Sequence, residues 1–139
     1  MNPVRALLAV LVGTGLFRLV VAVLETTLVG AAADTPVRTE VEYFAVRNQP
    51  AMLAAAVGYN CVAAVLAGYV LARIAGAREI MLATLAAAVQ TTALIWAFTA
   101  GDYAAFTPAW TRVVLVAATG PAMIGGAAIR VAARPDDMS

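Results

Sequence analysis

The chain has 139 residues, of which 63% are hydrophobic and only 12% are charged, and its formal net charge is +1. A soluble domain normally carries about twice that share of charge, and so small a net charge excludes the basic surface that a nucleic-acid-binding protein needs. With no histidine and a single cysteine, Cys61, the chain has no intramolecular disulfide and no histidine-based or cysteine-based metal cage. The composition therefore predicts one all-α membrane domain that works without a cofactor.

Four stretches are apolar and long enough to cross a bilayer as helices, which takes about 20 residues each. In chain order, we predict these helices at residues 3–33, 50–73, 78–101 and 108–132. Pro3, Pro50 and Pro108 stand at three of the predicted starts, where proline costs the helix no hydrogen bond. The first stretch is longer than the apolar core of a signal peptide and contains Arg18 and Glu25, so we expect a retained helix.

The only long polar stretch, residues 34–49, follows the first predicted helix. Val37, Val41 and Phe44 recur in it at helical spacing, with charged residues between them. This pattern predicts a short helix that lies along the membrane surface in the first outer loop. An irregular ordered loop explains the same residues equally well, and the sequence leaves both alternatives open.

Arginine placement predicts the orientation, because loops rich in positive charge stay in the cytoplasm. With both termini cytoplasmic, five arginines lie inside and three outside, while Arg18 lies within the first helix. Tryptophan and tyrosine favour the boundary between membrane and water, and several aromatic residues gather near the two predicted outer loops. We therefore expect a four-helix transmembrane bundle with both termini in the cytoplasm.

Five polar residues inside or at the edge of the predicted spans form a candidate intramembrane polar cluster, because polar groups in hydrocarbon are costly and need partners. These residues are Arg18, Glu25, Asn60, Gln90 and Arg112. Glu25 and Arg112 are expected at similar depths, so we predict an ion pair between the first and fourth helices. Arg18 is then expected to seek acceptors at mid-depth on Asn60 and Gln90. The sequence leaves three roles open for this cluster. It is a structural polar knot in which every group is hydrogen-bonded, a binding site for a polar headgroup or small anion, or part of a proton path.

Small residues at every third or fourth position predict close helix contacts, because small side chains let two backbones approach. Such spacing occurs on the second predicted helix at Ala54, Gly58 and Cys61, and again at Ala64 and Gly68. The fourth predicted helix has the same spacing at residues 118, 122 and 126. Gly120-Pro121 within that helix predicts a static kink, with a gating hinge as the alternative.

Short sequence words on two of the predicted helices resemble those of small, functionally uncharacterised four-helix bacterial membrane proteins. The words are AGYVLAR at residues 67–73, Pro108-Ala109-Trp110, and GPAMIGG at residues 120–126. The resemblance implies the same four-helix topology and carries no activity. Arginine without lysine adds a compositional indication of a GC-rich bacterial source.

No set of nucleophile, base and orienting residue and no phosphate-binding loop is present in the sequence. We therefore expect a protein that is not an enzyme, in the bacterial cytoplasmic (inner) membrane. The preferred hypothesis is an accessory or structural subunit that packs against a larger membrane complex or against its own copies. The alternative is a small transporter or a binder of lipid or small ligands that uses a midplane polar site.

Overall fold

The computed structural model describes residues 2–101 and 103–134, and every regular element in this part of the chain is helical. Four of the helices are long and apolar enough to cross a membrane. Their observed ends agree with the predicted ends to within two residues, the largest differences being Ala75 against 73 and Thr99 against 101. The elements are α1 (Pro3–Ala32), α2 (Glu40–Arg47), α3 (Pro50–Ala75), α4 (Glu79–Thr99), α5 (Tyr103–Phe106) and α6 (Ala109–Ala132).

Helix α2 resolves the open question about residues 34–49 in favour of a helix over residues 40–47. The Thr39 side chain accepts a hydrogen bond from the Glu42 backbone amide, at 3.2 Å, and the Glu42 carboxylate accepts one from the Thr39 amide. This reciprocal capping satisfies amides that have no partner inside the helix. It explains why so short a segment, of only eight residues, is helical.

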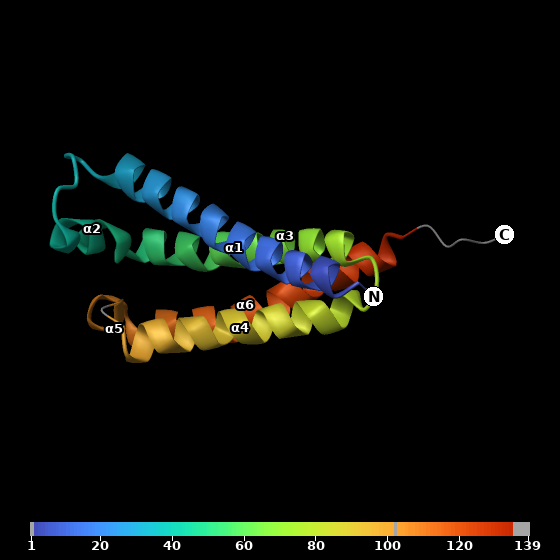
Figure 1. Cartoon of the computed structure of the whole chain (residues 1–139). Helices are drawn as coiled ribbons and strands as arrows, with labels where there is room; N and C mark the ends of the chain where they lie inside the picture. Colours follow the sequence, from blue (N-terminus) through green and yellow to red (C-terminus); the bar gives the residue numbers. More distant parts are fainter. Residues whose placement is uncertain (1, 102, 135–139) are drawn as a thin grey trace.

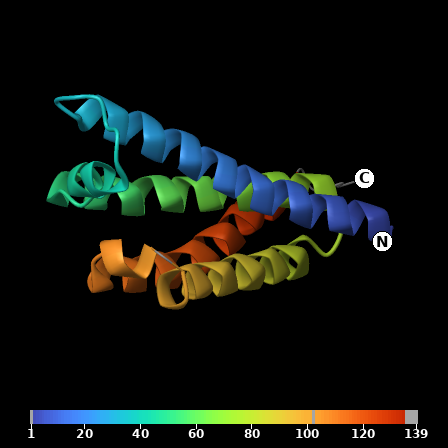
Figure 2. The same ribbon diagram turned by 60° about the vertical axis from the view of Figure 1, so that its left-hand side comes forward.

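Helix α3 lies at the centre of the bundle, where it packs against α1 on one side and α6 on the other. Helix α6 in turn packs against α4. Helices α1 and α4 meet near the end where the chain begins, and they diverge toward the end that carries α2 and α5 (Figures 1 and 2). The start of α1 and the end of α6 lie at the same end of the bundle (Figure 1).

The α3–α6 crossing is built from the small residues that the sequence singled out. A Cβ atom at Gly68 would lie 1.8 Å from the Met123 carbonyl oxygen, and one at Gly126 would lie 2.0 Å from the Val65 carbonyl oxygen. Only glycine allows the two backbones to approach this closely. The predicted contact at Ala64 and Gly68 is therefore confirmed.

The other small-residue face of α3 makes no close helix contact within the described part of the chain. Ala54 and Gly58 are exposed, Cys61 is half-buried, and a Cβ atom at Gly58 would meet nothing within 4 Å. The two groups of small residues differ mainly in their position along α3, and α6 approaches α3 closely at Val65 and Gly68 but not at Gly58.

Replacing Gly68 by alanine is expected to lower the free energy of unfolding by about 1–3 kcal/mol, the usual cost of forcing an extra carbon into a packed contact. Backbone atoms of Met123 would have to move to accept the new methyl group. Gly58→Ala is the matched control on the same helix, and it is expected to be neutral or slightly stabilising. Thermal unfolding in detergent micelles measures both variants. Equal melting temperatures for the two variants would contradict the close crossing.

Candidate binding cleft

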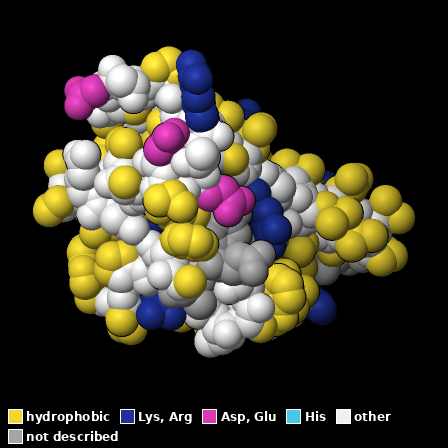
Figure 3. Space-filling view, turned by 90° about the vertical axis from the view of Figure 1, so that its left-hand side faces the viewer, with side chains coloured by type: hydrophobic (Ala, Val, Ile, Leu, Met, Phe, Trp, Pro, Cys, Tyr) yellow, Lys and Arg dark blue, Asp and Glu magenta, His cyan; other side chains and the backbone are white. Residues whose placement is uncertain are grey.

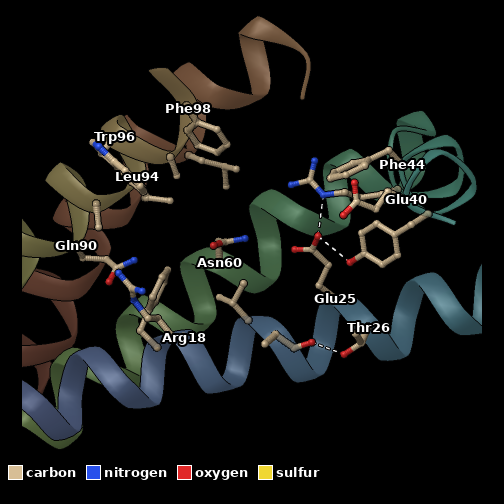
Figure 4. A pocket seen from close by; sticks show the side chains of 18 residues that line it. Arg18, Glu25, Thr26, Glu40, Phe44, Asn60, Gln90, Leu94, Trp96 and Phe98 are labelled. Carbon is tan, nitrogen blue, oxygen red and sulfur yellow. Dashed lines mark hydrogen bonds and ion pairs between the residues drawn. The ribbon is translucent and has the colours of Figure 1, made fainter. Parts of the chain in front are cut away.

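A cleft of about 660 Å³ opens where α1 and α4 diverge, and we call it the α1–α4 cleft (Figure 4). Helix α3 contributes Asn60 to its lining, and α2 contributes residues at one end. Most of the lining is apolar, including Phe17, Val21, Ala93, Leu94, Ala97 and Phe98. A volume of roughly 300–1,000 Å³ is typical of sites that hold one small ligand.

Glu25 of α1 is held by three donors at the α2 end of the cleft. Arg47 donates from Nε to Oε1 at 2.8 Å, and the Tyr43 hydroxyl donates to the same oxygen at 3.0 Å. The Tyr59 hydroxyl of α3 donates to Oε2 at 2.9 Å. Arg47 is only 7% exposed, so the ion pair neutralises a charge that would otherwise be buried alone.

The predicted pair of Glu25 with Arg112 was therefore wrong. Arg112 instead donates from Nη1 to the Phe98 carbonyl oxygen, at 3.2 Å. The prediction assumed that equal depth in the membrane would make Glu25 and Arg112 neighbours. In the structure, α1 packs against α3 and α4, and Arg47 of α2 lies beside Glu25. Arg112 is the one member of the predicted cluster that does not line the cleft.

Helix α2 is fastened to the start of α6 as well as to α1. Arg47 donates from Nη1 to the Thr107 hydroxyl at 3.3 Å, and the Asn48 amide donates to the Phe106 carbonyl oxygen at 2.5 Å. The Phe44 ring stacks on Phe106, with the ring centroids 4.7 Å apart. Acidic and basic side chains appear among hydrophobic ones on this end of the molecule (Figure 3). These contacts make α2 a fixed cover over one end of the cleft.

The sequence reasoning missed Arg47, Tyr43 and Tyr59. A signal for the first two was present, because Tyr43 and Arg47 are four residues apart and so lie on one face of the short helix. Nothing in the spacing of Tyr59, which lies 34 residues after Glu25, indicates that the two meet. Glu25 joins these residues only because α1, α2 and α3 converge at this end.

Arg18 lies halfway along α1, is exposed, and lines the cleft. Its side chain extends from α1 toward Gln90 on α4 (Figure 4). Within residues 2–101 and 103–134, no side chain or carbonyl group forms a hydrogen bond or ion pair with its guanidinium. The two carboxylates among the described lining residues, Glu25 and Glu40, therefore make no ion pair with Arg18.

Gln90 and Asn60 lie in the same cleft, but neither completes the predicted polar knot with Arg18. Asn60 donates to the Ala56 carbonyl oxygen of its own helix, at 2.8 Å. Gln90 is 4% exposed, and its Oε1 atom is buried without a hydrogen-bond partner among the described residues. A buried acceptor without a donor is unfavourable by about 1–3 kcal/mol. Arg18 and Gln90 together therefore offer a donor-rich cation and a free acceptor to a third group.

Within the described parts of the chain, no three His, Cys, Asp or Glu side chains come together to hold a metal ion. Among the described residues, the cleft lining combines an apolar wall with the unpaired Arg18 guanidinium, the unpartnered Oε1 atom of Gln90 and, on the α2 side, the Glu40 carboxylate. These groups suit binding of a molecule that is partly polar and partly apolar. Comparisons of the chain with family models, with curated proteins and with solved structures gave no match, so the four-helix resemblance stays a prediction and function is inferred from the cleft itself.

Proposed function

We propose that the chain is a non-catalytic membrane protein whose α1–α4 cleft binds one amphiphilic small molecule from the surrounding lipid. The observation that carries this proposal is the free Arg18 guanidinium in an otherwise mostly apolar cleft. A charged side chain in the middle of a transmembrane helix is costly and marks a functional site by default. Among the hypotheses drawn from the sequence, this supports the ligand binder over the accessory subunit.

The membrane setting belongs to the same proposal. Four helices have the required length and composition, and the arginine distribution favours cytoplasmic termini in a bacterial inner membrane. In this orientation, α2 lies on the outer side of the membrane, and the cleft opens toward lipid in the outer half of the bilayer. A ligand would enter sideways from the hydrocarbon, because α2 covers the outer end.

Purification in a mild detergent, followed by mass spectrometry of the extracted small molecules, tests the proposal. We expect close to one amphiphile per chain. Ala93→Trp places an indole in the cleft lining and is expected to abolish this co-purification. Ala88→Trp, on an exposed face of the same helix and outside the cleft, is the matched control and should retain the ligand. Equal ligand content in the two variants would refute binding in the cleft.

A second candidate function is the accessory subunit, and one observation favours it. The exposed face of α3 around Ala54 and Gly58 has open space beside its glycine, and the same small-residue spacing joins α3 to α6 inside the bundle. A partner helix or a second copy would fit there. Co-purification of one membrane protein in fixed ratio, lost in Gly58→Leu and kept in Ala93→Trp, would support this candidate over the ligand binder.

A further inference from the structure

We infer that the ligand of the α1–α4 cleft is a single-chain amphiphile with a carboxyl head, held by Arg18 and Gln90. The inference rests on the proposed function and names the chemical class of its ligand. Three observations carry it: a free guanidinium, a buried acceptor without a donor, and an apolar wall beside both.

The guanidinium of Arg18 binds best to a planar acceptor group that carries a negative charge or can ionise to carry one. A carboxylate accepts two parallel N–H bonds from one guanidinium, which is the strongest and most directional pairing that arginine makes. Glu25 cannot fill this role, because Arg47, Tyr43 and Tyr59 already occupy its oxygens. It is also seven residues farther along α1, roughly 10.5 Å along the helix axis.

The unpartnered Oε1 atom of Gln90 needs a hydrogen-bond donor, and this requirement further restricts the chemical class of the ligand's head group. A protonated carboxylic acid supplies both halves: its carbonyl oxygen accepts from Arg18, while its O–H donates to Gln90. When the head is ionised, the Gln90 amide group can donate to it instead. A quaternary ammonium head carries the same charge sign as the guanidinium and offers no acceptor, and an alcohol lacks the second oxygen that pairs with the guanidinium.

Access from the hydrocarbon also favours a carboxyl head. A carboxylic acid reaches mid-depth as its neutral form, whereas a permanently charged head would carry its full desolvation cost through the lipid. The Glu25 carboxylate, which would otherwise repel an acidic head, is neutralised by Arg47 at 2.8 Å. The Glu40 carboxylate also lines the cleft, but it lies on the α2 side, away from Arg18 (Figure 4). The cleft volume of about 660 Å³ suits one head with part of one chain.

Tryptophan fluorescence offers a direct test in the full-length protein, reconstituted in nanodiscs of phosphatidylcholine. Trp96 lines the cleft, whereas Trp110 on α6 does not. Trp110→Phe therefore leaves a reporter of the cleft, and Trp96→Phe leaves a reporter of bulk lipid. The probes carry bromine at mid-chain, because bromine quenches tryptophan fluorescence at short range. One probe is a fatty acid, and the others are the alcohol, alkyl phosphate, alkyl sulfate and alkyl trimethylammonium with the same brominated chain.

The acid is expected to quench Trp96 saturably, at a concentration at least about tenfold lower than the alcohol needs, and to quench Trp110 without saturation. Arg18→Gln should raise the half-saturating acid concentration about tenfold, the effect of losing a charged hydrogen bond. Gln90→Leu should raise it several-fold through a separate contact. Arg38→Gln, an exposed arginine outside the cleft, is the matched control and should leave binding unchanged.

Each other outcome has a distinct meaning. Saturable quenching of Trp96 that is equal for all heads and insensitive to Arg18→Gln would overturn the carboxyl assignment and leave the proposed function standing. Tighter binding of the alkyl phosphate or sulfate than of the acid would overturn it as well. No saturable quenching of Trp96 by any probe would refute the proposed function itself. Circular dichroism of each variant shows whether it is folded, and Arg18→Gln is expected to fold because Arg18 has no hydrogen-bond or ionic partner among the described residues.

Discussion

Replacing Glu25 by glutamine is expected to lower the free energy of unfolding by about 3 kcal/mol. Removing one partner of a buried ion pair typically costs roughly 3–5 kcal/mol, because the other charge is left uncompensated. We expect the lower end of that range, since the Glu25 side chain is 20% exposed. Glutamine keeps the shape of the side chain, but it has one acceptor oxygen where the carboxylate has two. Because Tyr43 and Arg47 donate to Oε1 and Tyr59 donates to Oε2, the change removes the charge together with one acceptor. Thermal or denaturant unfolding in micelles measures it.

Two further variants complete the Glu25 experiment. Glu25→Gln combined with Arg47→Met removes both charges and is expected to recover most of the lost stability, because no buried charge remains. Glu40→Gln removes an acid from the exposed surface of α2 and should change stability by less than about 0.5 kcal/mol. A double variant no more stable than Glu25→Gln alone would contradict the ion pair as the source of the effect.

Replacing Arg18 by leucine is expected to have the opposite sign and to stabilise the ligand-free protein. Insertion scales give a cost of about 2.5–3.5 kcal/mol for an arginine at the centre of a transmembrane helix. Arg18 lies at such a position and has no partner among the described residues to offset the cost. Unfolding of delipidated protein in micelles is the measurement. A ligand that binds the cleft should then raise the melting temperature of the wild type and not of Arg18→Leu.

The sign of the Arg18 effect separates a binding residue from a structural one. A residue kept for binding lowers stability in the empty protein, whereas a residue of a satisfied polar knot raises it. Arg38→Leu, in the loop before α2, is the matched control and should stay within about 0.5 kcal/mol of the wild type. If Arg18→Leu instead unfolds more easily than the wild type, the guanidinium has a stabilising partner in the folded protein. Ligand binding in the cleft would then not explain why an arginine stands at this position.

The sequence determined the four long helices and their bounds. An uninterrupted apolar stretch of this length can satisfy its backbone groups in lipid only as a helix, so length and composition suffice to predict it. The crossing at Gly68 was also predictable, because a close helix approach needs a small side chain there. Residues 40–47 were foreseen only as one of two alternatives, and the capping pair of Thr39 and Glu42 decided the outcome.

The contacts of the charged residues were decided by the tertiary structure alone. Depth along a helix can be read from the chain, and four of the five residues predicted as one polar cluster, Arg18, Glu25, Asn60 and Gln90, line one cleft without bonding to one another. Which helices are neighbours cannot be read in this way, and Glu25 therefore pairs with Arg47 rather than with Arg112. Helix α1 packs mainly against α3 and diverges from α4, and within the described residues this geometry leaves the Arg18 guanidinium and the Gln90 Oε1 atom without hydrogen-bond partners.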